Sequence, residues 1–274
     1  MKKLLLTNFF SLSLVFCLFL SCKTPENNST GGGQPGGPPP EDDGKLKPYK
    51  TYTINKREAL PGSPYHYEMW TEGGNNNKLI WYGPNQGGGA AFRAEWNSPN
   101  DFLGRVGYYW DAGKPYTYYG NIFCDFEYTR SDDKTAGDYS YIGIYGWSKN
   151  QLIEYYIVED WFSNRYYSSW NPVGKDTIGV NSHGSYSLDG ETYLVYKKTR
   201  TGPSISGNTT FTQYFSVRKS QRKKGTISIT EHFKKWENLE MKLGTNMFEC
   251  KFLVEAGGGT GWFDASYLTF YQKD

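Results

Sequence analysis

The sequence contains little cysteine and histidine, and neither sign of charge is in clear excess. Its 274 residues include four cysteines and three histidines, without a Cys-x-x-Cys pair or a His-Glu-x-x-His motif. We therefore expect no metal site, and no cofactor is implied. The 30 Lys and Arg residues nearly balance the 28 Asp and Glu residues, so nothing directs the protein towards nucleic acid, and an uncharged ligand is expected.

Segments with helical periodicity are scarce as well. A single stretch, Thr230–Met241, predicts a helix, with Thr230 as its capping residue. One buried stripe is indicated by the spacing of Phe233, Trp236 and Leu239 or Glu240. His232 is interpreted as a hydrogen-bonded structural residue, because no nucleophile is evident beside it.

Aromatic residues, in contrast, are abundant: 24 Tyr, 9 Trp and 16 Phe make up 18% of the chain. Rings with polar tips suit a solvent-lined cleft that stacks on sugar rings. An aromatic-rich β core is the alternative, and it accounts for many of these residues.

From about residue 65 to residue 274, short alternating segments are separated by Gly, Asn and Asp, which predicts an all-β sandwich. In Tyr141–Trp147 the aromatic residues share one face and the two isoleucines share the other. In Glu154–Val158 the same period places Glu154, Tyr156 and Val158 together, away from Tyr155 and Ile157.

The first 21 residues predict an export signal, because Lys2 and Lys3 precede a nearly all-apolar run from Leu4 to Leu20. The run is too short and wrongly flanked for a transmembrane helix. It ends in Leu18-Phe19-Leu20-Ser21-Cys22, which resembles a bacterial lipobox and predicts a membrane anchor through a lipid on Cys22. An ordinary signal peptide is the alternative. We expect an exported protein, at the cell surface or on a periplasm-facing outer membrane, or otherwise secreted.

Residues 22–63 are predicted to form a flexible tether. Much of this stretch is rich in Pro, Gly and acidic residues, and such a composition cannot bury a core. Residues 64–274 then form one domain, which contains Cys124 and Cys250. Export would allow these two cysteines to form a disulfide, and free buried thiols are the alternative.

Two glutamates lie in strand-like segments beside aromatic residues: Glu154 in Gln151–Trp161 and Glu255 in Phe252–Gly259. An ionised carboxylate inside a strand is costly unless it is paired, hydrogen-bonded or used. A glycosidic bond is commonly cleaved by two carboxyl groups, of which one donates a proton and the other attacks the anomeric carbon or activates water. Spacing alone leaves open whether this pair is catalytic or lies on the surface.

Six segments of the chain carry a family resemblance through their sequences and their order. They are Trp70–Gly74, Tyr145–Trp147, Glu154–Glu159, Thr199–Gly207, Phe211–Arg218 and His232–Gly244. Together they resemble glycoside hydrolase family 11, the endo-1,4-β-xylanases. The resemblance implies an all-β fold, a β-jelly-roll sandwich of two strongly twisted antiparallel sheets with one α-helix, and xylan as the substrate.

The resemblance also implies the site residues. Glu154 would be the nucleophile and Glu255 the general acid/base of a retaining mechanism, with their carboxyl groups about 5 Å apart. Asp101 would set an acidic pH optimum by sharing a proton with Glu255. Substrate would be bound by Trp70, Tyr141, Tyr145, Trp147, Tyr156, Arg200, Pro203 and Gln213. Of these, Tyr145, Tyr156 and Arg200 would also keep Glu154 ionised.

The sequence departs from the family pattern in four places. Gln151 replaces a proline, Phe215 replaces a tryptophan, the thumb loop over Arg200–Pro203 is one residue shorter, and Ala256-Gly257 follows Glu255. We expect a monomeric endo-1,4-β-xylanase. A β-1,4-glucanase on a related sandwich and a non-catalytic xylan-binding surface lipoprotein are the alternatives.

Overall fold

The computed structural model describes residues 44–111, 113–132, 137, 139–162 and 180–273. They belong to one of the two units into which the chain divides, Asp43–Asp274. The predicted signal peptide over 1–21, Cys22 and the tether up to residue 43 lie outside the described residues. Within the described part, no helix is long and apolar enough to span a membrane.

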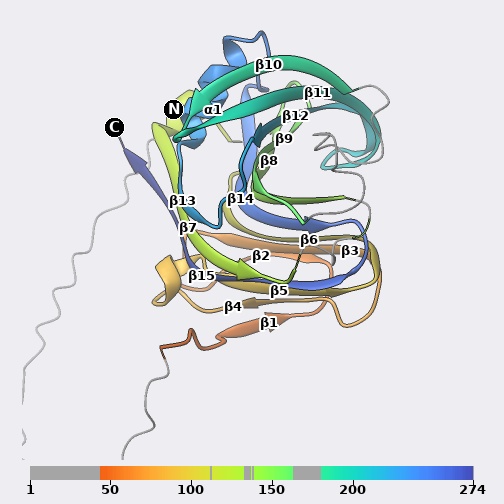
Figure 1. The fold of residues 1–274 in the computed structure, drawn as a ribbon, viewed down its shortest axis with the longest axis vertical. Helices are drawn as coiled ribbons and strands as arrows, with labels where there is room; N and C mark the ends of the chain where they lie inside the picture. The colour runs from red at the N-terminus through yellow and green to blue at the C-terminus, as the bar shows by residue number, and fades with distance from the viewer. Residues whose placement is uncertain (1–43, 112, 133–136, 138, 163–179, 274) are drawn as a thin grey trace, which may run out of the picture. The chain divides into compact units, whose positions relative to one another are not determined.

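The unit is built from two sheets, as predicted, and the smaller has six strands (Figure 1). Its order is β1 (Lys50–Tyr52), β4 (Lys78–Trp81), β5 (Phe92–Asn97), β15 (Thr260–Lys273), β7 (Asn121–Arg130) and β13 (Lys224–Ile227). All its neighbouring strands are antiparallel. This sheet forms one of the two layers of the sandwich.

The larger sheet has nine strands. Its order is β10 (Val180–Leu188), β11 (Glu191–Ser204), β12 (Gly207–Arg218), β9 (Ile153–Asp160), β8 (Ser140–Lys149), β14 (Asn246–Ala256), β6 (Pro99–Tyr109), β3 (His66–Gly73) and β2 (Lys56–Ala59). The β-jelly-roll prediction is confirmed, with one parallel pair, β12 with β9, in otherwise antiparallel sheets. Two short 3-10 turns, η1 (Gly87–Gly89) and η2 (Tyr116–Tyr119), lie in connections.

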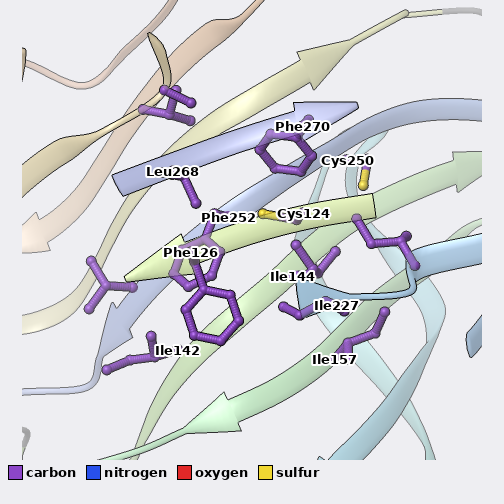
Figure 2. Packing of buried hydrophobic residues seen from close by; sticks show 14 of the residues in the cluster. Cys124, Phe126, Ile142, Ile144, Ile157, Ile227, Cys250, Phe252, Leu268 and Phe270 are labelled. Atoms are coloured by element: carbon purple, nitrogen blue, oxygen red, sulfur yellow. The ribbon is translucent and has the colours of Figure 1, made fainter. Parts of the chain in front are cut away.

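Two buried clusters lie on opposite faces of the nine-stranded sheet. The main core contains Ile142, Ile144, Tyr155 and Ile157, whereas a second cluster contains Tyr141, Tyr145, Trp147, Tyr156 and Val158. The predicted alternation in both segments is therefore confirmed. Figure 2 shows part of the main core, where the isoleucines meet aromatic side chains of other strands.

Cys124 and Cys250 lie in this main core as free thiols (Figure 2). Burial raises the pKa of Cys250 to about 12 and that of Cys124 well above its ordinary value. Of the two alternatives left open by the sequence, the structure has the free buried thiols rather than the disulfide.

The predicted helix exists, but its ends differ from the prediction. α1 spans Ile229–Glu237 with Ser228 as its N-cap, so the assignment of Thr230 as the cap was wrong. The Thr230 hydroxyl instead accepts a hydrogen bond from the Ile122 N–H at 2.9 Å and donates one to the Gly120 carbonyl at 3.1 Å. The part of the buried stripe that lies in α1 is confirmed, because Phe233 and Trp236 are fully buried, whereas Leu239 and Glu240 lie beyond the end of the helix at Glu237.

His232, in the same helix, is buried between two partners. Its Nδ1 lies 2.6 Å from the Tyr186 hydroxyl, and its Nε2 lies 3.5 Å from Asp189. These contacts support the structural role expected for this histidine.

The described sandwich starts before the predicted domain boundary at residue 64. β1 pairs with β4, and β2 pairs with β3. The Tyr52 ring also stacks on Tyr67 with centroids 3.5 Å apart. The tether predicted over 22–63 therefore does not extend through residues 50–59, because these residues form sheet hydrogen bonds and bury an aromatic side chain.

Candidate active site

The concave face of the nine-stranded sheet bears a cleft of about 560 Å³. Figure 1 shows how this sheet curls from β10 and β11 through β9 and β8 to β6 and β3. Nine of the predicted site residues line the cleft: Trp70, Asp101, Tyr145, Trp147, Glu154, Tyr156, Arg200, Pro203 and Glu255. The other two in the described part, Tyr141 and Gln213, are buried beside it, opposite Glu255 and Glu154 respectively.

Glu154 is held by two hydrogen-bond donors. It lies on β9 between Trp147 of β8 and Gln213 of β12 in the sheet register. The Tyr145 hydroxyl donates to Oε1 at 2.8 Å, and Gln213 Nε2 donates to Oε2 at 2.6 Å. Both oxygens are therefore occupied, and the carboxylate is fixed in one orientation. Gln213 was predicted to bind substrate hydroxyls, but in this structure its amide is directed at Glu154.

The pKa of Glu154 is raised from its ordinary value because burial disfavours the charged form. The hydrogen bonds from Tyr145 and Gln213 oppose this, as do the charges of Arg200 and Arg105. Tyr145 and Arg200 thus act in the predicted direction, and burial outweighs them.

Glu255 has a different environment. It lies on β14, opposite Leu103 of β6 and Tyr141 of β8, and is 4% exposed. Its Oε2 is buried and has no hydrogen-bond partner among the described residues. Burial raises the pKa of Glu255 well above its ordinary value, and the charges of Asp101 and Glu154 raise it further. Glu255 therefore keeps a proton at pH values where an ordinary carboxyl group has lost it.

Asp101 is the neighbour of Glu255 on β6. It precedes Leu103 by two residues, so its side chain points to the same face as Glu255 and is its diagonal neighbour. Burial raises the pKa of Asp101 to about 7, although a hydrogen bond from Tyr139 and the charge of Arg200 lower it. The two acids thus titrate as an interacting pair.

Arg200 enters the cleft from the β11–β12 hairpin, the segment predicted to be the thumb. This hairpin keeps its strand pairing from Tyr193 with Arg218 to Ser204 with Gly207 at its tip. Ser204 and Gly207 are also joined by a 2.6 Å hydrogen bond from the Ser204 hydroxyl to the Gly207 carbonyl. The charge of Arg200 lowers the pKa of each of the three acids, Asp101, Glu154 and Glu255.

Aromatic rings support the wall around Glu154. Tyr156 stacks on Phe215 with centroids 4.7 Å apart and an interplanar angle of 11°, and Trp147 packs on Phe211 at 4.9 Å. Phe215, which departs from the family pattern, therefore still supplies the ring that supports Tyr156.

The curl of the sheet brings the two glutamates into one cleft. Along β8, Glu255 is level with Tyr141 and Glu154 is level with Trp147. The stretch between these two positions would span about 20 Å if the strand were straight. Both carboxylates nevertheless line the same cleft, and the charge of Glu154 acts on Glu255. The sequence cannot give this proximity, because it depends on the curvature of the whole sheet.

The sequence reasoning missed a group of four charged residues at the cleft: Glu68 and Arg105, which line it, and Glu249 and Lys251, which pair with them. The alternation of side chains along each strand could have identified them. Each of these positions is an even number of residues from a predicted site residue on its own strand: Glu68 from Trp70, Arg105 from Asp101, and Glu249 and Lys251 from Glu255.

The described part of the chain contains no group of side chains suited to bind a metal ion. There, no three His, Cys, Asp or Glu side chains are grouped so that they could hold a metal ion. The charged groups that can be assigned a chemical role in the cleft are carboxylates and guanidinium groups.

The chain is similar to known proteins over most of its length. The model of the family described as "Glycosyl hydrolases family 11" matches residues 63–266. Endo-1,4-beta-xylanase C of Fibrobacter succinogenes is 47% identical over 212 residues, which is 77% of this chain and 32% of that protein. Endo-1,4-beta-xylanase A of Piromyces sp. is 40% identical over 227 residues, which is 81% of this chain and 34% of that protein. This chain thus spans about a third of each of these two relatives.

A solved structure covers the same region more completely. A crystallised mutant of ENZbleach xylanase is 57% identical, with a TM-score of 0.79. The match covers 84% of this chain and 89% of that one.

Proposed function

The chain belongs to glycosyl hydrolase family 11, and from this membership we propose that it is an endo-1,4-β-xylanase that cleaves internal bonds of xylan with retention of configuration. The names of its relatives, which are xylanases, support this substrate. The observation that carries the proposal is the unequal setting of two buried carboxyl groups in one cleft. Glu154 accepts two hydrogen bonds that oppose the rise of its pKa, whereas the pKa of Glu255 is raised well above its ordinary value and its Oε2 has no hydrogen-bond partner among the described residues.

The first step uses this difference. Glu154, oriented by Tyr145 and Gln213, attacks the anomeric carbon and forms a covalent glycosyl ester. The bond from that carbon to the leaving oxygen breaks, and Glu255 transfers its proton to this oxygen. A raised pKa suits Glu255 for this task because the proton is still bound at pH values where an ordinary carboxyl group has lost it.

In the second step Glu255 changes from acid to base. Glu255, now a carboxylate, removes a proton from a water molecule while the water oxygen attacks the anomeric carbon. The ester bond to Glu154 breaks, and Glu154 leaves as a carboxylate that Tyr145 and Gln213 again stabilise. Two inversions at one carbon give net retention.

Sugar rings would be held by the walls of the cleft. Trp70 offers a partly exposed ring from β3 for stacking, and Pro203 and Ile205 at the end of the β11–β12 hairpin face the same space. Tyr141 is 7% exposed and packs with Tyr156 and Phe215, so we assign it to support of the wall rather than to direct contact with substrate.

The proposal is tested with purified protein that lacks residues 1–22. It should release reducing sugar from xylan much faster than from cellulose or mixed-linkage β-glucan. Activity mainly on the glucans would favour a β-glucanase, and binding of xylan without any hydrolysis would indicate a non-catalytic protein. Either result would refute the xylanase proposal.

The separate roles of the glutamates are tested by substitution. In Glu154→Ala, azide should fill the vacated space and restore turnover with inversion of configuration, whereas azide should react with retention in Glu255→Ala. Glu127→Ala is the matched control, because Glu127 lies on β7 of the other sheet. Equal behaviour of the two cleft variants would mean that the roles are misassigned.

We also propose that Cys22 carries a lipid and anchors the exported protein to a membrane. The apolar run that ends at Ser21-Cys22 supports this proposal. In a bacterial host, the parent should fractionate with membranes, and mass spectrometry should find an acylated N-terminal Cys22. Cys22→Ser should remain unacylated. An unmodified mature N-terminus elsewhere in the parent would contradict the anchor.

A further inference from the structure

Four charged side chains form a closed ring at the cleft, which two of them, Glu68 and Arg105, line. Arg105 Nη2 lies 3.0 Å from Glu68 Oε1 and 3.7 Å from Glu249 Oε1. Lys251 Nζ lies 3.1 Å from Glu68 Oε2 and 2.6 Å from Glu249 Oε2. Cations and anions therefore alternate around the ring, whose four charges balance, and Arg57 adds a further cation with its Nη1 3.7 Å from Glu68 Oε2.

The ring is costly to bury, which makes its position informative. The side chains of Glu249 and Lys251 are fully buried, and that of Arg105 is 6% exposed. Removing charges from water is costly even when they are paired, and an apolar cluster of the same volume is often at least as stable. Stability alone therefore gives a weak reason for placing this ring at the cleft.

Arg105 connects the ring to the site. Its guanidinium carbon lies 4.4 Å from the centre of the Tyr145 ring, a cation–π contact. The Tyr145 hydroxyl accepts a hydrogen bond from Trp147 Nε1 and donates its own to Glu154. The orientation of this donor therefore depends on a ring that Arg105 covers.

Arg105 also acts on the acids through its charge, because it lowers the pKa of both Glu154 and Glu255. Glu154 is influenced from each element around it. The groups concerned are Arg200 on β11, Gln213 on β12, Tyr145 on β8, Tyr156 on β9, Asp101 and Arg105 on β6, and Glu255 on β14. Arg105 and Arg200 are the two cations of this set, and Arg105 is the one that ion pairs hold in place.

We propose that Arg105 is a positioning residue for Glu154: it fixes the Tyr145 ring and favours the carboxylate form of the nucleophile, while Glu68 and Glu249 hold Arg105 in place. The inference rests on the proposed glycosidase function. It adds a second cation, Arg105, to Arg200, which the resemblance assigned. It also explains why a ring of largely buried charged residues lies at an aromatic cleft.

The first test replaces Arg105 with methionine. Loss of the cation should raise the pKa of Glu154, so the acid limb of kcat/KM should move to higher pH by about one unit. Arg130→Met is the matched control, because Arg130 is equally buried, pairs with Asp160 at 2.6 Å and covers the Phe162 ring at 4.7 Å, away from the cleft. The control should lower the melting temperature and leave the acid limb in place. The same result in Arg105→Met would overturn the proposal.

Two milder substitutions separate charge from geometry. Glu249→Gln removes an anion from the ring, so the acid limb should move in the opposite direction, to lower pH. Arg105→Lys keeps the charge and loses the planar group on Tyr145, so kcat should fall at least several-fold while the acid limb stays in place. If Arg105→Met does not fold, Glu249→Gln still tests the electrostatic role of Arg105. An unchanged acid limb of kcat/KM in Glu249→Gln would refute that role.

A direct readout keeps this inference distinct from the function on which it rests. The Glu154 carboxyl group can be titrated by carbon-13 NMR in the parent and in each variant, whether or not xylan is hydrolysed. An active parent with the same Glu154 titration in all variants would reject the role of Arg105 alone. An inactive parent would reject the xylanase proposal, and the order of the three titrations would still test the positions of the charges.

Discussion

Replacing Asp101 with asparagine is expected to extend xylan hydrolysis to higher pH. Protonated Asp101 can donate a hydrogen bond to Glu255, whose Oε2 has no other partner among the described residues. In the proposed mechanism, that bond stabilises the carboxylate which Glu255 would become on protonating the leaving oxygen. Ionised Asp101 instead raises the pKa of Glu255 and makes it a weaker acid. Asparagine offers an amide donor at every pH.

The pKa of Asp101, about 7, sets the size of the effect. Its protonated fraction falls from about nine-tenths at about pH 6 to about one-tenth at about pH 8, so kcat of the parent should fall about tenfold over this interval. The Asp101→Asn variant lacks this titration, and its kcat should fall less than about threefold. The parent should accordingly have the acidic optimum that the sequence predicts.

The assay is a pH series of kcat on soluble xylan, measured by the release of reducing ends. Asp125→Asn makes the same chemical change on β7, outside the cleft, and should keep the profile of the parent. If the parent and Asp101→Asn lose activity in parallel as pH rises, the Asp101 proton is not required and the reasoning is wrong.

The same substitution has a predictable effect on stability. A raised pKa in the folded state means that the contribution of Asp101 is fully present below its unfolded value of 3.8 and is lost as pH rises through about 7. Asp101→Asn should therefore increase the free energy of unfolding near pH 8, by at most about 4 kcal/mol, and less under acid conditions. Urea unfolding at the two pH values measures this difference.

Three further outcomes are expected. Gln213→Met removes one of the two hydrogen bonds to Glu154, so the acid limb of kcat/KM should rise by about one pH unit, and an unchanged limb would contradict the pairing. Phe233→Ala leaves a cavity under Tyr155 and Trp236 and should cost about 3–5 kcal/mol in urea unfolding; a loss below about 1 kcal/mol would mean that α1 is loosely packed. Adding a thiol reductant should leave the melting temperature unchanged, because Cys124 and Cys250 are free, and a clear fall would reveal a disulfide.

The side-chain period predicted which residues of two strands share the face of the candidate site, and the family resemblance supplied the site residues themselves. The period placed Tyr145 and Trp147 on the face opposite Ile144, and the structure has them on the two sides of one sheet. This works because successive residues of a strand point to opposite faces, whatever the strand pairs with. The assignment failed where neighbours decide the local structure. Thr230 has the chemistry of a cap, but its hydroxyl is engaged by the backbone of Gly120 and Ile122.

Contacts between distant segments were beyond the reach of sequence patterns. The sequence around Tyr52 is typical of a polar linker, and only the structure shows that this ring stacks on Tyr67. Glu249 and Lys251 look like ordinary charged positions on a strand, and only the approach of Glu68 and Arg105 from other strands shows that they can be buried.

The sequence by itself determined the all-β class and the faces of the strands, because these follow from local alternation and residue chemistry, whereas the roles expected for the two glutamates came from the family resemblance. Only the tertiary structure decided how Glu154 and Glu255 come together. The curl of nine strands brings Glu154 and Glu255 into one cleft, and burial there raises the pKa of both. The distance between the two carboxyl groups, their burial and the effect of each charge on the other depend on residues far apart in the chain. No local sequence pattern can therefore predict them.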